Sequence, residues 1–456
     1  MGFRITTNMM MNSYRYNLQN NTQKLADSRD MFLTHRNFNS YAEDPASATR
    51  AFRLRRSYPR TVNQLNNAKD CYGKFNTAWN NLGEIITNLQ NPLAKVSSIT
   101  GPNGTAGESR SALAQVLRET ADSVVHSMNA QLGEQFVFAG VDGMNVPFTW
   151  SEDGTQLYFR GVNVNAGDVE LPDAAVLQAP DWLDKAKNDG QAAGTWSDND
   201  EAWYQYYSGN PDSKIPDFTQ QPKWAEEMMG KTAATDEEKA WLNYYKDRND
   251  MAKLKSMSSE ERYIDLGMGA KENAPNDPIL GSYFNDALVG INFLGYGQDE
   301  SDGFGDPKNY AIMLKELADV FDDWRESGQM YLPPEYQDMT ADELKTAMQD
   351  EDVEKYIKDY HKQQEDKAFR MIDKLKAGQE KFTESYVEMD ARSKFLQTTQ
   401  DRLSTQQLNI NEQFLDIEQV DLAEAITNFS WDMYCYNAAL KIGNQLLSQS
   451  LIDYMN

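Results

Sequence analysis

The chain has 456 residues, enough for about three domains of ordinary size, and carries 70 acidic against 44 basic side chains, a net charge of −26. This acidic excess opposes binding to a nucleic acid or an anionic membrane surface, because both carry phosphate groups. Two cysteines and three histidines leave little material for a disulfide framework, a metal centre or a general base, so we expect no cofactor and no enzymatic activity.

No apolar run reaches the roughly 18 residues that a membrane-spanning helix needs. The N-terminal region also lacks the charged and then apolar plan of a cleavable signal peptide. We therefore expect no membrane insertion, and an export route that uses no cleaved signal.

Residues 1–34 carry apolar side chains at heptad spacing, which predicts a helix with one packing face. The positions are Met11, Tyr14, Leu18, Leu25 and Phe32, with polar Asn21 and Ser28 at the two remaining ones. A longer series over residues 54–93 averages about 3.5 residues per step, a spacing typical of one long helix that packs along another. Only Thr61 interrupts this series. Pro59 predicts a helix start or a kink, because proline removes a backbone hydrogen bond and clashes with the preceding turn.

A third helix is predicted over residues 108–134, after a glycine-rich loop at 101–104, as a hairpin partner of the 54–93 helix. Short apolar runs bounded by glycine or proline then predict strands. These strands are residues 136–140, 157–161, 263–268 and 291–294, and a helix is expected over 309–327.

Two segments, 173–260 and 329–366, are rich in acidic residues, tryptophan and tyrosine, and we interpret them as surface-exposed additions. The first contains an aromatic group consisting of Trp196, Trp203, Tyr204, Tyr206, Tyr207 and Trp224. The core of a small domain is the favoured interpretation, and a surface that contacts glycan or protein is the alternative.

Near the C-terminus, one apolar register runs over residues 375–417, breaks at 418–421 and resumes one residue out of phase. The break predicts a local change of winding or a joint between two helical segments. The resumed series is Leu422, Ile426, Phe429, Met433, Tyr436, Leu440, Leu447 and Tyr454. Together with the apolar series of residues 1–34, it predicts the packing within the subunit and between subunits.

Three motifs could in principle bind a ligand or a metal ion, but each has a simpler structural interpretation. His361 and Glu365 have the spacing of two metal ligands, but a solvated helix face is favoured because no second histidine is near. The acidic run at 299–306 lacks calcium-loop spacing and is interpreted as a flexible acidic turn. The Gly-x-Gly pieces at 267–269 and 295–297 are interpreted as turns at strand ends.

Two apolar termini can satisfy each other if the chain folds back on itself. We therefore predict a mainly α fold with a smaller β part: a long antiparallel helical rod with paired terminal helices, then a helical bundle with a β-hairpin, carrying an inserted outer α+β domain. The expected domains are residues 1–44 with 420–456, residues 45–172 with 372–419, and residues 173–371. A rod with apolar ends is typical of a self-associating subunit, because heterologous contacts propagate without closing.

Both ends of the sequence resemble the flagellin superfamily. At the start, the motifs are Arg4-Ile5-Thr6-Thr7-Asn8-Met9-Met10 and Tyr41-Ala42-Glu43-Asp44-Pro45-Ala46. At the end, they are Ile417-Glu418-Gln419-Val420-Asp421-Leu422-Ala423-Glu424-Ala425 and Ser450-Leu451-Ile452-Asp453-Tyr454. The element Phe136-Val137-Phe138-Ala139-Gly140 followed by Pro147-Phe148 is most similar to the hook-associated protein 3 branch, which forms the junction between hook and filament.

The resemblance implies a nonenzymatic structural subunit of the bacterial flagellum, secreted by type III export. Its implied partners are copies of itself, the neighbouring hook-side junction protein, filament flagellin and an export chaperone at the C-terminal helix. Filament flagellin itself is the alternative, and a flagellin-like subunit with a glycan-binding or enzymatic central domain is a lower one.

Overall fold

The computed structural model describes residues 7–38, 40, 42–99, 107–167, 180–208, 216–233, 235–269, 272–274, 277–278, 282–299, 303–325 and 328–454. Helices dominate these residues, and the strands are short and antiparallel, so the predicted mainly α class with a smaller β part is confirmed. The chain divides into two compact units, residues 1–68 with 398–456 and residues 69–397. The three domains expected from the sequence remain a prediction, and the loop expected at 101–104 lies outside the described residues.

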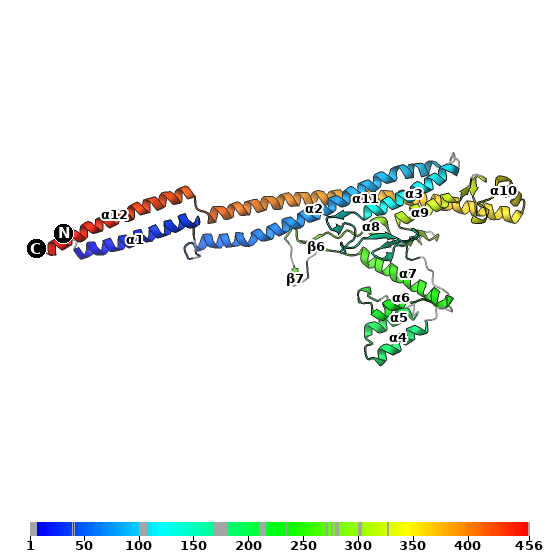
Figure 1. The fold of residues 1–456 in the computed structure, drawn as a ribbon, viewed down its shortest axis with the longest axis horizontal. Helices are drawn as coiled ribbons and strands as arrows, with labels where there is room; N and C mark the ends of the chain where they lie inside the picture. Colours follow the sequence, from blue (N-terminus) through cyan, green and yellow to red (C-terminus); the bar gives the residue numbers. More distant parts are fainter. Residues whose placement is uncertain are drawn as a thin grey trace. The chain divides into compact units, whose positions relative to one another are not determined.

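The first unit contains two helices from opposite ends of the chain, α1 (Thr7–Thr34) and α12 (Leu422–Tyr454). They lie side by side and antiparallel (Figure 1). Near the end of α1, Phe32 stacks on Phe429 near the start of α12, with 5.8 Å between ring centroids. Near the start of α1, Tyr14 lies against Gly443, further along α12. The predicted joint is confirmed, since α11 (Glu351–Glu418) ends at Glu418 and α12 begins at Leu422.

Helix α2 (Pro45–Ile99) begins at a proline, a residue suited to the first turn of a helix. Asp44 caps this end, because its Oδ1 accepts hydrogen bonds from the backbone N–H groups of Ala46 and Ser47 at 3.1 and 3.0 Å. Hydrogen bonding to Ser47 lowers the pKa of the Asp44 carboxyl. The helix runs through Pro59, so the predicted helix start at that position is wrong. Packing on both sides of Pro59 stabilises the helix there, where Ala51 and Leu65 are buried.

In the second unit, α3 (Gly107–Met128) packs antiparallel on α9 (Tyr310–Asp322). Arg118 forms ion pairs with Asp319 at 2.7 Å and Asp322 at 2.5 Å. One turn further along α3, Asp122 pairs with Lys315 at 3.0 Å. Helix α3 ends six residues before the predicted 134, because the chain turns there into the hairpin of β1 (Gln131–Leu132) and β2 (Gln135–Phe136).

Predicted strands are only partly right. The predicted run 136–140 is reduced to the end of β2 and an isolated bridge at Ala139. The run 291–294 forms a short helix, α8 (Ile291–Leu294), which buries Ile291 and Leu294 at helical spacing. A four-residue apolar run fits either structure, and sequence periodicity alone cannot distinguish them. Gly295 therefore ends a helix, with φ of 84°, rather than a strand.

The longest sheet has three antiparallel strands in the order β3 (Phe148–Trp150), β4 (Leu157–Phe159), β5 (Val162–Asn163), with Phe148 opposite Phe159. Besides the β1–β2 hairpin, the described strands form four more antiparallel pairs. These are β6 (Tyr263–Ile264) with β9 (Phe284–Asn285), β7 (Glu272–Ala274) with β8 (Asp277–Pro278), β10 (Gln298–Asp299) with β11 (Asp306–Pro307), and β12 (Trp324–Arg325) with β13 (Met330–Tyr331).

The first acidic addition is helical. It consists of α4 (Asp181–Ala192), α5 (Asp198–Tyr207), the 3-10 turn η1 (Phe218–Gln220), α6 (Lys223–Met229) and α7 (Asp236–Ser258). Trp203, Tyr206 and Tyr207 are buried with Trp241 and Tyr245, which confirms the small-domain core for these members of the aromatic group. Trp196, Tyr204 and Trp224 lie half-buried at its edge.

The second acidic addition packs on the start of α11. It contains η3 (Pro334–Tyr336) and α10 (Ala341–Ala347), where Thr340 and Glu343 form a capping box. Leu332, Leu344 and Ile357 form its small core.

Buried ion pairs attach the hairpins to the long helices. Asp286 follows β9 and accepts two hydrogen bonds from Arg262, while its backbone carbonyl accepts one from Lys74 Nζ of α2 at 2.8 Å. Asp306 of β11 is 3% exposed and contacts Lys374 Nζ of α11 at 2.9 Å and Arg370 Nε at 3.3 Å. Ion pairs thus hold both ends of the acidic run at 299–306, through Asp299 and Asp306. Residues 300–302 lie outside the described part, so the flexible turn stays a prediction.

Candidate assembly surface

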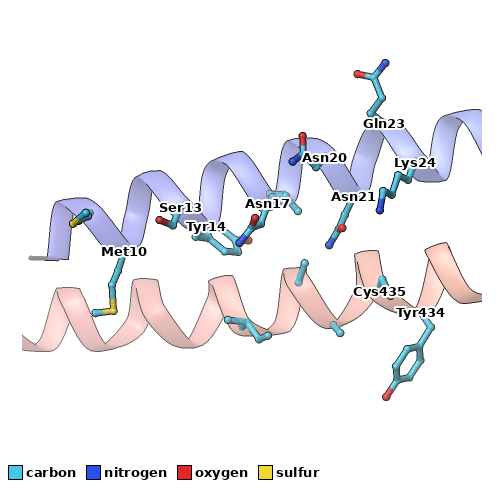
Figure 2. A pocket seen from close by; sticks show the side chains of 15 residues that line it. Met10, Ser13, Tyr14, Asn17, Asn20, Asn21, Gln23, Lys24, Tyr434 and Cys435 are labelled. Carbon is cyan, nitrogen blue, oxygen red and sulfur yellow. The ribbon is translucent and has the colours of Figure 1, made fainter. Parts of the chain in front are cut away.

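Helix α1 presents its predicted heptad face to a partner. Met11, Tyr14, Leu18, Leu25 and Phe32 are all half-buried, and the polar residues in the same series follow them, with Asn21 half-buried and Ser28 buried. Figure 2 shows Tyr14, Asn17 and Asn21 on the side of α1 that faces α12, whereas Gln23 points away.

Helix α12 faces α1 mainly through small residues. Ala425 is 3% exposed, and Gly443 is buried against Tyr14 so closely that a Cβ atom at this position would overlap the tyrosine hydroxyl. Phe429 and Tyr436, both predicted, are half-buried. Because Gly443 has no side chain, α12 leaves room for the Tyr14 ring, and the two helices can pack closely at this point.

Four of the predicted residues on α12 remain largely uncovered. Leu422, Ile426, Met433 and Leu440 are 44%, 45%, 45% and 43% exposed. Their spacing of four and then seven places them on one face, which we call the first stripe. The side chains of Leu447 and Tyr454 lie outside the described residues.

A second apolar face on α12 was missed by the sequence analysis. Trp431, Tyr434 and Ile442 are 65%, 67% and 54% exposed, and Trp431 stacks on Tyr434 at 5.9 Å. Figure 2 shows Tyr434 pointing away from α1. Ala438 completes this face, which we call the second stripe, and the spacing 431, 434, 438, 442 is the signal that could have predicted it. Exposed apolar faces of this kind mark protein interaction surfaces.

A groove of about 1120 Å³ runs between α1 and α12 (Figure 2). Its α1 wall is mostly polar and uncharged, with serine, asparagine and glutamine beside Met9, Met10, Tyr14, Leu18 and a single cation, Lys24. Its α12 wall consists of Tyr434, Cys435, Ala438, Ala439 and Ile442. No carboxylate is among the described residues that line the groove, so the acidic character of the chain does not extend into this lining.

The joint between α11 and α12 is built around Glu418, which is 7% exposed. Its carboxylate forms ion pairs with Arg55 at 2.6 Å and Arg36 at 3.2 Å. The backbone N–H of Asn37 donates to the Glu418 carbonyl at 2.9 Å, and the Asn37 side chain donates to the carbonyls of residues 417 and 419. The chain that leaves α1 and the chain that leaves α11 therefore bind each other where both helices are interrupted.

The motifs weighed for chemistry have structural partners. His361 is half-buried rather than solvated, because its Nδ1 accepts a hydrogen bond from the backbone N–H of Tyr331 at 3.2 Å, while Glu365 is exposed. Burial lowers the pKa of the His361 imidazole. Among the described residues, no group of three or more His, Cys, Asp and Glu side chains is placed to hold a metal ion.

In the part of the chain that the structure describes, no helix combines the length and the apolar character required to cross a bilayer.

Comparison with known proteins gives one family match. Residues 5–142 match the family model for the bacterial flagellin N-terminal helical region. The match supports the flagellin superfamily. It covers α1, the loop to α2, α2 and α3, so it includes one wall of the groove and one side of the joint. For this flagellin-like chain, a flagellar structural subunit is the function that the match supports.

No curated protein matches the sequence. Among solved structures, one from Vibrio parahaemolyticus described as a "putative flagellar hook-associated protein" is 12% identical, with 83% of this chain and all of that chain covered and a TM-score of 0.40.

Proposed function

We propose that the chain is a structural subunit of the bacterial flagellum that forms the junction between hook and filament. In this proposal, α1 and α12 pair within one subunit, and the two exposed stripes of α12 pack against neighbouring copies. The proposal rests on the pairing of α1 with α12, which leaves two apolar faces of α12 uncovered. Residues 5–142 of the same chain match the flagellin N-terminal helical region.

The first test is the variant Leu440→Asp. Leu440 is 43% exposed, so the charge meets water in the single subunit and the fold should be unaffected. In an assembled tube the same charge would be buried without a partner, which costs several kcal/mol. We expect normal circular dichroism and thermal unfolding, with loss of sedimentable polymer in an assembly assay.

The matched control is Asn411→Asp, which adds the same charge at an exposed polar position on α11, outside both stripes. We expect this variant to assemble. Normal polymer from Leu440→Asp would show that the first stripe does not pack between subunits.

The junction role rests on the resemblance of residues 136–148 to the hook-associated protein 3 branch, and filament flagellin is the alternative. Immunogold labelling of sheared flagella separates the two. Label confined to a short band at the hook end supports a junction subunit, whereas label along the filament supports flagellin. The same experiment tests the proposed partners, the hook-side junction protein and filament flagellin, as neighbours.

Secretion by type III export, with a chaperone on α12, is part of the proposal. The exposed stripes supply its physical reason, since apolar faces of this size favour aggregation unless they are covered before export. A lower alternative places glycan binding or catalysis in the central region. Burial of Trp203, Tyr206 and Tyr207 in the helical core gives this alternative little support.

A further inference from the structure

A second pocket, of about 620 Å³, lies in the unit formed by residues 69–397 and apart from the terminal helices. Residues from α7, α8, the start of α9 and α11 line it, so it is formed by segments that are distant in sequence. Its apolar lining includes Met251, Ile291, Leu294 and Met313. A cavity of this size and mixed lining is typical of a small-molecule site.

The charge of the pocket is opposite to that of the chain. Four lysines line it, Lys255, Lys308, Lys374 and Lys381, against a single carboxylate, Asp299. Asp299 is paired with Lys374 at 3.0 Å. The other three lysines are exposed and form no ion pair within the described part of the chain. In a chain of net charge −26, a local excess of about three positive charges favours an anion.

Tyr310 forms part of the wall of the pocket. Tyr310 lines the pocket and is 2% exposed, and its hydroxyl has no hydrogen-bond partner among the described residues. The oxygen has almost no accessible surface, so a ligand in the pocket would contact the ring rather than the hydroxyl. Burial raises the pKa of the Tyr310 phenol.

The position of Tyr310 is fixed from two sides. Its ring makes a T-shaped contact with Phe382 at 5.1 Å, and it lies so close to Gly378 of α11 that a Cβ atom there would come within 2.5 Å of the ring. At the start of α9, the N–H groups of Ala311 and Ile312 already donate to the side chain of Asn309. The lysines are therefore the groups that favour a negatively charged ligand.

We propose that this pocket binds a small amphipathic carboxylate, whose acid group is held by the lysines and whose apolar part contacts the methionines and α8. A carboxylate fits because it accepts charge-assisted hydrogen bonds from ammonium groups. An apolar body fits because the buried side chains of α8 and Met313 form much of the lining.

The test is a titration of the full chain with 4-fluorophenylacetate, followed by fluorine NMR. We expect saturable binding with a dissociation constant below about 1 mM. The neutral 4-fluorophenylacetamide, which has the same shape without the charge, should bind at least tenfold more weakly. Absence of saturable binding, or equal binding of acid and amide, would overturn the proposal.

Variants assign the binding to this pocket. The double variant Lys308→Gln/Lys381→Gln should weaken acid binding at least tenfold, because it removes two ammonium groups from the lining. The control Lys185→Gln/Lys223→Gln removes two exposed lysines from α4 and α6 and should bind as the wild type does. Equal loss in the control would show non-specific charge attraction and reject the site.

Sedimentation velocity of the same variants distinguishes a free acid from a carboxylate of a second copy of the chain. Unchanged self-association in Lys308→Gln/Lys381→Gln supports the small-molecule site. Reduced self-association without any effect on 4-fluorophenylacetate binding would reject it.

Discussion

At the residue scale, the charged form of one buried lysine in the second unit destabilises the folded chain. Lys74 of α2 has a side chain only 12% exposed, beside Asp286 and Arg262. Burial, together with the charge of Arg262, lowers the pKa of Lys74 to about 8, although Asp286 acts in the opposite direction. The ammonium form is therefore less stable in the folded chain than in the unfolded one.

The sign of the resulting pH dependence follows from the two pKa values. Below pH 8 both states are protonated and the cost of burying the charge is fully present. Between about pH 8 and 10.5 the folded chain loses the proton first, so the cost is relieved as pH rises. Lys74→Met removes this group, so the stability of wild type relative to the variant should rise by about 2 kcal/mol between pH 7.5 and 9.5. Urea unfolding at the two pH values measures it.

Lys69→Met, at an exposed position on the same helix, is the control and should show no such pH-dependent difference. Parallel stabilities of wild type and Lys74→Met at both pH values would contradict the prediction.

At the element scale, the joint depends on a carboxylate that the apolar pattern could not identify. The register break at 418–421 predicted where the helix ends, because a phase change in a heptad series requires a change of winding or an interruption. It did not predict that Arg36 and Arg55 would converge on Glu418, since these residues are distant in sequence and arginines are common on exposed helix faces. Long periodic elements were therefore predictable, whereas contacts between them were not.

Glu418→Gln tests the joint. The amide keeps the shape of the carboxylate but loses the attraction of two guanidinium groups, each about half exposed, so we expect a loss of about 1 kcal/mol in local stability. The backbone N–H groups of Asn37 and Val420 donate across the joint, and their hydrogen exchange should accelerate about fivefold. Asp416→Asn, an exposed neighbour, should leave both rates unchanged. Unchanged exchange in Glu418→Gln would mean that the backbone bonds hold the joint without the ion pairs.

The same contrast explains the seam. On α1, the predicted face is half-buried along its whole length, because large side chains and the two polar residues share one heptad series. On α12, the buried residues among those described are Ala425 and Gly443, whereas the prediction rested on the large apolar residues. Small residues give a weak hydrophobic signal but permit the closest helix approach, so an apolar pattern alone places the contact on a neighbouring face.

At the scale of the whole molecule, the net charge of −26 opposes any association between copies. The described lining of the groove between α1 and α12 contains no carboxylate, and the stripes of α12 are apolar, so the proposed contacts are not themselves electrostatic. Charge repulsion between subunits and apolar attraction between stripes thus come from different parts of the chain. Salt distinguishes the two contributions, because it screens charge repulsion but does not weaken the burial of apolar surface.

We therefore expect the critical concentration for assembly to fall several-fold between 50 and 500 mM sodium chloride, as measured by pelleting. The Debye length shortens from more than 10 Å to less than 8 Å across this range, which weakens repulsion between neighbouring acidic surfaces. Leu440→Asp should not assemble at either concentration, because screening does not remove the cost of burying its charge. A critical concentration that rises with salt would instead indicate that ion pairs hold the subunits together, and that the apolar stripes of α12 are not the principal contacts.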